Sequence, residues 1–130
     1  MQGLHLTADL QGCPAGLAPM TDRLALRALC VELVVQAGLQ PVGELFHRFT
    51  PAHPDEAAGV TGVVLLAESH LAIHTWPELG GVTLDVYVCN FSDDNRGRAQ
   101  ALMDSLVRAF KPQRVQRQQL ERGGLAALLR

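Results

Sequence analysis

The sequence has few cysteines and no long apolar run, and each scarcity excludes a class of protein. Its three cysteines, Cys13, Cys30 and Cys89, are far apart and include no Cys-x-x-Cys pair, which argues against a disulfide framework or a cysteine zinc site. No apolar run reaches the roughly 18 residues of a membrane helix, and the start lacks the pattern of a secretory signal peptide. We therefore expect a cytoplasmic protein that contacts no membrane.

A strong net charge is missing as well. The 130 residues carry a formal net charge of −2, and the basic residues late in the chain do not alternate with aromatic residues, which argues against a nucleic-acid partner. Hydrophobic residues make up 48% of the chain and charged residues 18%, a balance typical of a compact globular protein. We therefore expect a single domain, residues 1–130.

Two segments with apolar residues at helical spacing predict amphipathic helices. The first helix is expected to follow a capping residue at Thr21 or Asp22 and to end near Ala37. The second is expected to follow Asp93 or Asp94 and to end at the next proline. Their predicted apolar stripes are, respectively, Leu24, Ala28, Val31 and Val35, and Ala99, Leu102, Leu106 and Phe110.

Six further segments have the composition of β-strands: residues 3–10, 42–49, 60–67, 71–76, 82–89 and 115–120. The order β-α-β-β-β-β-α-β predicts an α+β fold, a two-layer sandwich of an antiparallel-rich sheet with both helices on one face. The other face of the sheet must then be covered, most simply by a second copy of the chain.

Ser69 follows Glu68 at the end of an apolar run, and two histidines lie just downstream. His70 and His74 would lie about 13 Å apart along a strand, too far to bind one zinc ion at about 2 Å each. A hydrolase nucleophile elbow, Gly-x-Ser-x-Gly, is absent. Two interpretations remain: a strand-end serine with a hydrogen-bonded core histidine, or a serine that attacks its own preceding peptide bond.

Several motifs occur in the same order along nearly the whole chain: Gly3-x-His5, Gly12-Cys13, Phe46-His47-Arg48-Phe49-x-Pro51, Gly62-Val63-Val64, Glu68-Ser69-His70-x-x-Ile73-His74-Thr75-Trp76-Pro77-Glu78, Asp85-Val86-x-x-Cys89 and Glu121-Arg122-Gly123. Together they resemble the short prokaryotic S-adenosylmethionine decarboxylase proenzymes. The block that begins at Glu68 is the most specific of them.

This resemblance implies that the chain cleaves itself between Glu68 and Ser69, through attack of the Ser69 hydroxyl on the preceding carbonyl. Residue 69 then becomes a pyruvoyl cofactor, which forms a Schiff base with the substrate amine. Thr61 stands where the family usually has serine and would support processing, and His74 would remove the Ser69 α-proton. On a straight strand Ser69 and His74 lie about 16 Å apart, so the chain would have to turn near His70 for His74 to act.

The resemblance also implies the remaining site residues and the partners. Cys89 corresponds to the proton donor in decarboxylation. Glu78 would bind the ribose hydroxyls of S-adenosylmethionine, and Phe49 and Trp76 would line its adenine site. The family works as a homodimer whose subunits share each active site, and its product supplies spermidine synthesis.

Three departures from the family pattern fall outside the processing residues. Leu4 replaces the usual arginine, Leu79 and Gly81 replace two tyrosines, and the loop around residues 52–58 is longer. They leave open a pyruvoyl-dependent decarboxylase of another amino acid, such as ornithine or arginine. An unprocessed binding module with the same fold is the third possibility.

Overall fold

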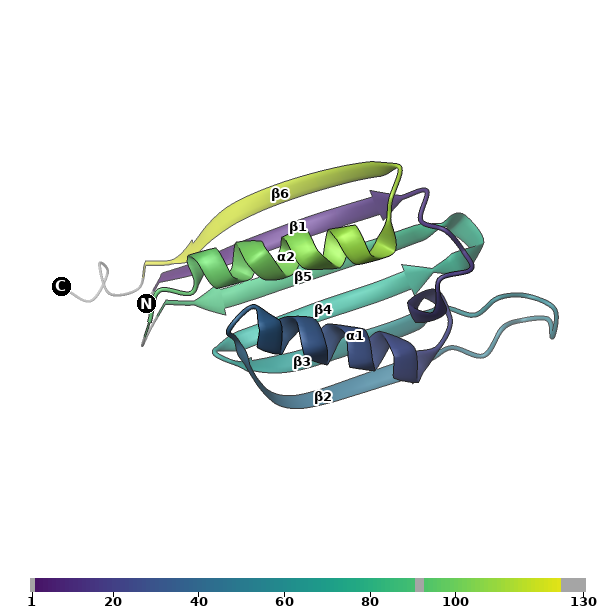
Figure 1. The fold of residues 1–130 in the computed structure, drawn as a ribbon, viewed down its shortest axis with the longest axis horizontal. Coiled ribbons are helices and arrows are strands. Elements are labelled where there is room, and N and C mark those ends of the chain that lie inside the picture. Colours follow the sequence, from purple (N-terminus) through teal and green to yellow (C-terminus); the bar gives the residue numbers. More distant parts are fainter. Residues whose placement is uncertain (1, 91–92, 125–130) are drawn as a thin grey trace.

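The computed structural model describes residues 2–90 and 93–124, which form one antiparallel sheet and two α-helices (Figure 1). The strand order across the sheet is β2-β3-β4-β5-β1-β6, and every neighbouring pair is antiparallel. The strands are β1 (Gln2–Gln11), β2 (Gln40–Arg48), β3 (Val60–Ala67), β4 (Ser69–Trp76), β5 (Gly81–Cys89) and β6 (Arg114–Gly123). The helices are α1 (Arg23–Gln36) and α2 (Arg96–Phe110), and short 3-10 helices lie at Ala18–Met20 and Pro77–Leu79.

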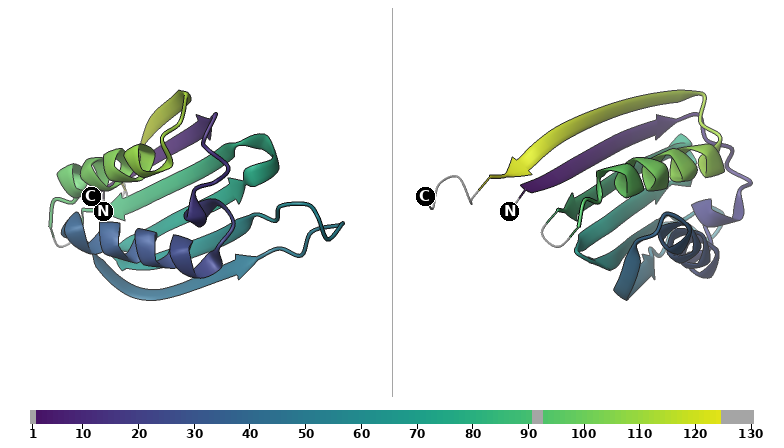
Figure 2. Two further views of the ribbon diagram at one scale, coloured as in Figure 1. Left: turned by 45° about the vertical axis from the view of Figure 1, so that its right-hand side comes forward. Right: turned by 60° about the vertical axis from the view of Figure 1, so that its left-hand side comes forward.

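Both helices lie on the same face of the sheet, and the turned views in Figure 2 show them as a layer in front of it. The predicted α+β two-layer sandwich is therefore confirmed. Within the described residues, neither helix has the length and apolar character needed to cross a bilayer.

Helix α1 begins where predicted but buries a different stripe. Asp22 Oδ1 accepts hydrogen bonds from the backbone N–H groups of Leu24 (2.9 Å) and Ala25 (3.2 Å), which makes Asp22 the N-cap. The predicted stripe is wrong, because Leu24 and Val35 are exposed. The buried residues of α1 are instead Leu26, Cys30 and Val34. Both sets have helical spacing, so periodicity alone does not decide which one faces the sheet.

Helix α2 buries the predicted stripe, but its predicted cap is wrong. The helix begins at Arg96, and the residue at the N-cap position is Asn95 rather than Asp93 or Asp94. Asp94 Oδ1 still accepts a hydrogen bond from the Arg96 N–H at 3.1 Å. The buried residues of α2 include all four predicted ones, Ala99, Leu102, Leu106 and Phe110.

Strand β4 begins two residues earlier than predicted because a tight hairpin joins it to β3. Leu66 is opposite Ser69, so only Ala67 and Glu68 lie between the paired residues. The strand then pairs with β5 without interruption to its end. A turn near His70, required if His74 is to reach Ser69 of the same chain, is therefore absent. The other predicted strands are confirmed to within three residues at each end.

The sheet face turned away from the helices, here called the bare face, carries large exposed apolar side chains. Leu45, Leu65 and Leu120 alternate with residues that face the helices, and their exposed fractions are 71%, 49% and 58%. The opposite face packs against α1 and α2 and contains the core. Apolar groups of this size on a sheet face mark a surface for association.

Candidate active site

The turn between β3 and β4 holds Ser69 in a strained backbone conformation. Its φ is +100°, a region that costs a residue other than glycine roughly 1–3 kcal/mol. Ser69 lies opposite Leu66 on β3 and Val88 on β5, so the surrounding sheet maintains this conformation. Glu68 precedes it in the turn and is half-buried. The Glu68–Ser69 peptide bond is thus held in place from both sides.

Cys89, the last residue of β5, lies beside Ser69. The distance between Ser69 Oγ and Cys89 Sγ is 3.1 Å, and either atom can be the hydrogen-bond donor. Asn95 Nδ2 donates a hydrogen bond to the Cys89 carbonyl oxygen at 2.9 Å, which fixes the end of β5 against the start of α2. The structure therefore brings two of the predicted site residues, Ser69 and Cys89, into direct contact.

Tyr87 is a third member of this group, and the sequence interpretation missed it. Its hydroxyl accepts a hydrogen bond from Cys89 Sγ at 3.6 Å. A hydrogen bond that the phenol donates to a Cys89 thiolate, together with burial, raises the pKa of Tyr87 above its ordinary value, while the nearby Arg122 guanidinium lowers it. The sequence signal that could have identified Tyr87 is its spacing from Cys89, since residues two apart on a strand share a face. We call Glu68, Ser69, Tyr87 and Cys89 the serine end of β4.

His74 lies near the other end of β4 and contacts Thr61. Its Nδ1 is 2.6 Å from Thr61 Oγ1, because the two residues are directly opposite in the β3–β4 register. The His74 ring also lies 5.9 Å from the Trp76 ring, centroid to centroid. Over residues 2–90 and 93–124, no three His, Cys, Asp or Glu side chains gather in a way that could hold a metal ion.

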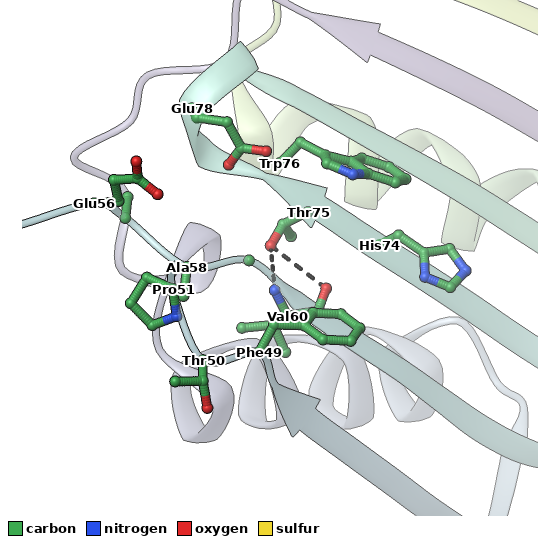
Figure 3. Close-up of a pocket in the computed structure, with 12 residues that line it drawn as sticks. Phe49, Thr50, Pro51, Glu56, Ala58, Val60, His74, Thr75, Trp76 and Glu78 are labelled. Carbon is green, nitrogen blue, oxygen red and sulfur yellow. Dashed lines mark hydrogen bonds between the residues drawn. The ribbon is translucent and has the colours of Figure 1, made fainter. Parts of the chain in front are cut away.

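A cavity of about 730 Å³ opens beside His74. Figure 3 shows His74, Trp76 and Phe49 around it, with the carboxylates of Glu78 and Glu56 at its rim. One cavity is therefore lined by the predicted base, His74, and by the three predicted substrate-binding residues, Phe49, Trp76 and Glu78. Glu56, from the longer loop, was not predicted. We call Phe49, Thr61, His74, Trp76 and Glu78 the pocket end of β4.

The loop of residues 50–59 forms one wall of the cavity and is anchored at its base. The Phe49 N–H donates a hydrogen bond to the Gly59 carbonyl at 3.0 Å. A Cβ at Gly59 would lie 2.1 Å from the Thr75 carbonyl oxygen, so this close approach requires glycine. Thr75 Oγ1 accepts from the Val60 N–H at 2.9 Å and donates to the Met20 carbonyl at 2.8 Å. The buried Thr75 thereby fixes the wall to the sheet.

The serine end and the pocket end do not meet within one chain. Ser69 and His74 are five residues apart on an uninterrupted strand, which separates them by roughly 16 Å. One group therefore consists of Glu68, Ser69, Tyr87 and Cys89, and the other of Phe49, Thr61, His74, Trp76 and Glu78.

The chain resembles proteins of one family in sequence. The family model for S-adenosylmethionine decarboxylase matches residues 4–123. The S-adenosylmethionine decarboxylase proenzyme of Aquifex aeolicus is 40% identical over 122 residues, which cover 93% of this chain and 81% of that protein. The proenzyme of Archaeoglobus fulgidus is 35% identical over 121 residues, which cover 93% of this chain and 97% of that protein.

Solved structures give the same result. The crystal structure of the adenosylmethionine decarboxylase from Aquifex aeolicus superposes with a TM-score of 0.80 at 38% identity, over 93% of this chain and 90% of that chain. The Trypanosoma brucei AdoMetDC-delta26 monomer shares the fold, with a TM-score of 0.55 at 14% identity, over 88% of this chain and 44% of that chain. On the sequence match over nearly its whole length, the chain belongs to the S-adenosylmethionine decarboxylase family.

Proposed function

We propose that this chain is a self-processing, pyruvoyl-dependent decarboxylase of S-adenosylmethionine, whose product supplies spermidine synthesis. The relatives are named decarboxylase proenzymes, and a proenzyme needs a bond to cleave. The observation that carries the proposal is the serine end: a strained Ser69, preceded by Glu68, with its hydroxyl 3.1 Å from the Cys89 thiol.

In the proposed processing reaction, the chain supplies both the nucleophile and the bond that breaks. Ser69 Oγ attacks the Glu68 carbonyl carbon, and the amide becomes an ester as the nitrogen takes up a proton. Loss of the Ser69 α-proton then breaks the Cβ–Oγ bond and releases Glu68 as a free carboxylate. Water then displaces the nitrogen of the new amino end, which leaves as ammonia, and a ketone remains at residue 69. Backbone strain at Ser69 favours the first step, because replacing the Glu68–Ser69 amide by an ester relieves the strain.

The residues of the serine end fit a pyruvoyl group at position 69. Once formed, that group supplies a carbonyl that binds the substrate amine and accepts the electron pair released as carbon dioxide leaves. The Cys89 thiol already contacts residue 69, so it is in reach to hold the proton that the product carbon needs. Because Cys89 is half-buried, its thiol can recover that proton from solvent.

The pocket end fits a positively charged nucleoside. Phe49 and Trp76 provide aromatic surfaces for an adenine ring and a sulfonium group. The Glu78 carboxylate accepts hydrogen bonds, as two ribose hydroxyls require. Ornithine and arginine have no ring to stack on these aromatic residues, which supports S-adenosylmethionine as the substrate.

We further propose that two copies complete each site. In this arrangement the two bare faces pack together, and the twofold axis lies in the interface perpendicular to the strands. The strands of one copy then run antiparallel to those of the other. The serine end of one β4 then faces the pocket end of the other, and His74 can reach the Ser69 α-proton of its partner. Exposed Leu45, Leu65 and Leu120 would be buried in this contact.

Two measurements test the proposed function. Denaturing mass spectrometry of the purified chain should show a fragment of residues 1–68 and a second fragment, blocked at residue 69, that ends at residue 130. A single intact mass after prolonged incubation would contradict self-processing. Carbon dioxide release should be observed with S-adenosylmethionine and not with ornithine or arginine. Release from either amino acid at a comparable rate would contradict the substrate assignment.

A further inference from the structure

Among the residues that the structure describes, the Cys89 thiol has two hydrogen-bond partners, and only one of them belongs to the processing reaction. Ser69 Oγ lies 3.1 Å from Cys89 Sγ, and the Tyr87 hydroxyl accepts from the same sulfur at 3.6 Å. Ser69 loses its hydroxyl when a ketone forms at residue 69. Tyr87 is then the remaining hydrogen-bond partner of the thiol among those that the structure describes.

The Tyr87 ring is itself held by its neighbours on the bare face. The Arg122 guanidinium carbon lies 4.9 Å from the ring centroid, a cation–π distance. The His70 ring packs against it edge-on with centroids 5.8 Å apart. A Cβ at Gly3 would lie 2.8 Å from Tyr87 Cε1, so glycine at this position makes room for the ring. Strands β1, β4 and β6 thus fix a side chain that projects from β5.

We propose that Tyr87 is a positioning residue for the proposed decarboxylation, whose hydroxyl holds the Cys89 thiol against residue 69. A cysteine side chain has three staggered χ1 rotamers, and a proton donor acts only from the one that faces the reacting carbon. The phenol oxygen selects that rotamer through its hydrogen bond to the sulfur. This inference rests on the function proposed above and adds a residue to it.

The electrostatics of Tyr87 agree with this contact. The hydrogen bond to Cys89 is the largest cause that raises the pKa of the phenol, and burial and the charge of a Cys89 thiolate act in the same direction. Arg122 lowers the pKa of the same group. Tyr87 is the only tyrosine in the chain, so the near-ultraviolet signal of tyrosinate formation reports on this one residue.

The first test follows this signal in the Ser69→Ala chain, which cannot cleave itself. Adding Cys89→Ala should lower the Tyr87 titration midpoint toward about 10, the ordinary value of tyrosine. Adding Arg122→Gln should raise the midpoint. An unchanged midpoint in the Cys89→Ala chain would overturn the proposal, because the thiol would then not contact the phenol.

The second test measures catalysis in Tyr87→Phe, which keeps the ring and removes only the hydroxyl. We expect kcat to fall roughly three- to tenfold, the size of one ordinary hydrogen bond, with KM and the extent of self-cleavage unchanged. Thr7→Val, which removes a hydroxyl from β1 on the same face of the sheet, should leave kcat unchanged. An unchanged kcat in Tyr87→Phe, or an equal loss of cleavage and turnover, would overturn the positioning role.

The two proposals fail separately. An intact or inactive wild-type chain would contradict the proposed function, whereas the tyrosine titration in the uncleaved Ser69→Ala chain does not depend on activity. Gly3→Ala provides a second variant for the same comparison. Its Cβ would displace the Tyr87 ring, so it should lower the titration midpoint and kcat together, and a normal value of either would count against the proposal.

Discussion

The two ends of β4 differ in almost every physical respect. The serine end is half-buried and strained, and hydrogen bonds link Ser69, Cys89 and Tyr87 in series. The pocket end is an open cavity of about 730 Å³ with aromatic walls and carboxylates at its rim. One strand therefore separates the nucleophile and the thiol at its start from His74 and the aromatic and acidic side chains at its end. The difference supports the proposal that a single chain carries two half-sites.

The largest expected effect is at Ser69. Ser69→Ala removes the nucleophile, so both self-cleavage and carbon dioxide release should fall below detection. Mass spectrometry and a radiolabelled carbon dioxide assay measure the two quantities. Ser105→Ala, which removes a hydroxyl on α2, is the matched control and should behave as wild type. Cleavage of the Ser69→Ala chain at the same bond would show that Ser69 is not the nucleophile, and would contradict the role given to the serine end.

Cys89→Ala should separate the two reactions that share the serine end. We expect turnover to fall by roughly 10²–10⁴-fold, the usual contribution of a positioned proton donor, and cleavage to proceed to most of its normal extent. Rates of fragment formation and of carbon dioxide release, measured on the same preparation, give the ratio. Equal loss of both rates would show that the thiol serves processing rather than proton transfer.

Substitutions of the two carboxylates at the rim of the cavity should change binding and leave cleavage intact. Glu78→Gln weakens a carboxylate contact to the ribose, and we expect KM to rise about tenfold. Glu56→Gln, in the loop that walls the cavity, should raise KM about twofold to threefold through loss of one negative charge near a cationic substrate. A lower kcat with unchanged KM in Glu78→Gln would be the contrary result, since it would place this residue in the chemistry.

The smallest effect concerns the accessibility of the thiols. Burial raises the pKa of Cys30 to about 12 and also raises that of Cys13, whereas Cys89 is half-buried. A small alkylating reagent at about pH 8.5, near the ordinary cysteine value, should therefore label Cys89 first in the folded chain. Peptide mapping identifies the labelled residue, and preferential labelling of Cys30 would contradict this difference between the cysteines.

The sequence predicted the helices and strands of the fold, but it did not predict which side of every element is buried. Alternating residues in β5 and the stripe of α2 are unambiguous because one set of apolar positions dominates in each. In α1, two sets of apolar residues have helical spacing, and contacts with the sheet select the one that contains Cys30. Propensity could not make that choice, because it depends on tertiary packing.

The candidate site was predictable as a set of residues but not as an arrangement. Motif resemblance supplied Ser69, His74 and Cys89, and the β4–β5 register explains the contact between Ser69 and Cys89. Tyr87 was missed because a lone tyrosine on a strand has no motif of its own. Glu56 was missed because its position depends on the path of the loop, which few local interactions determine.

The most direct test of the two half-sites is complementation between inactive chains. Ser69→Ala retains His74, and His74→Ala retains Ser69, so each variant alone should remain uncleaved and inactive. Co-expressed, they should form mixed dimers in which the His74→Ala chain is cleaved, with about a quarter of all sites active if pairing is random. Cleavage of the His74→Ala chain alone, or no cleavage in the mixture, would contradict a site assembled from two copies.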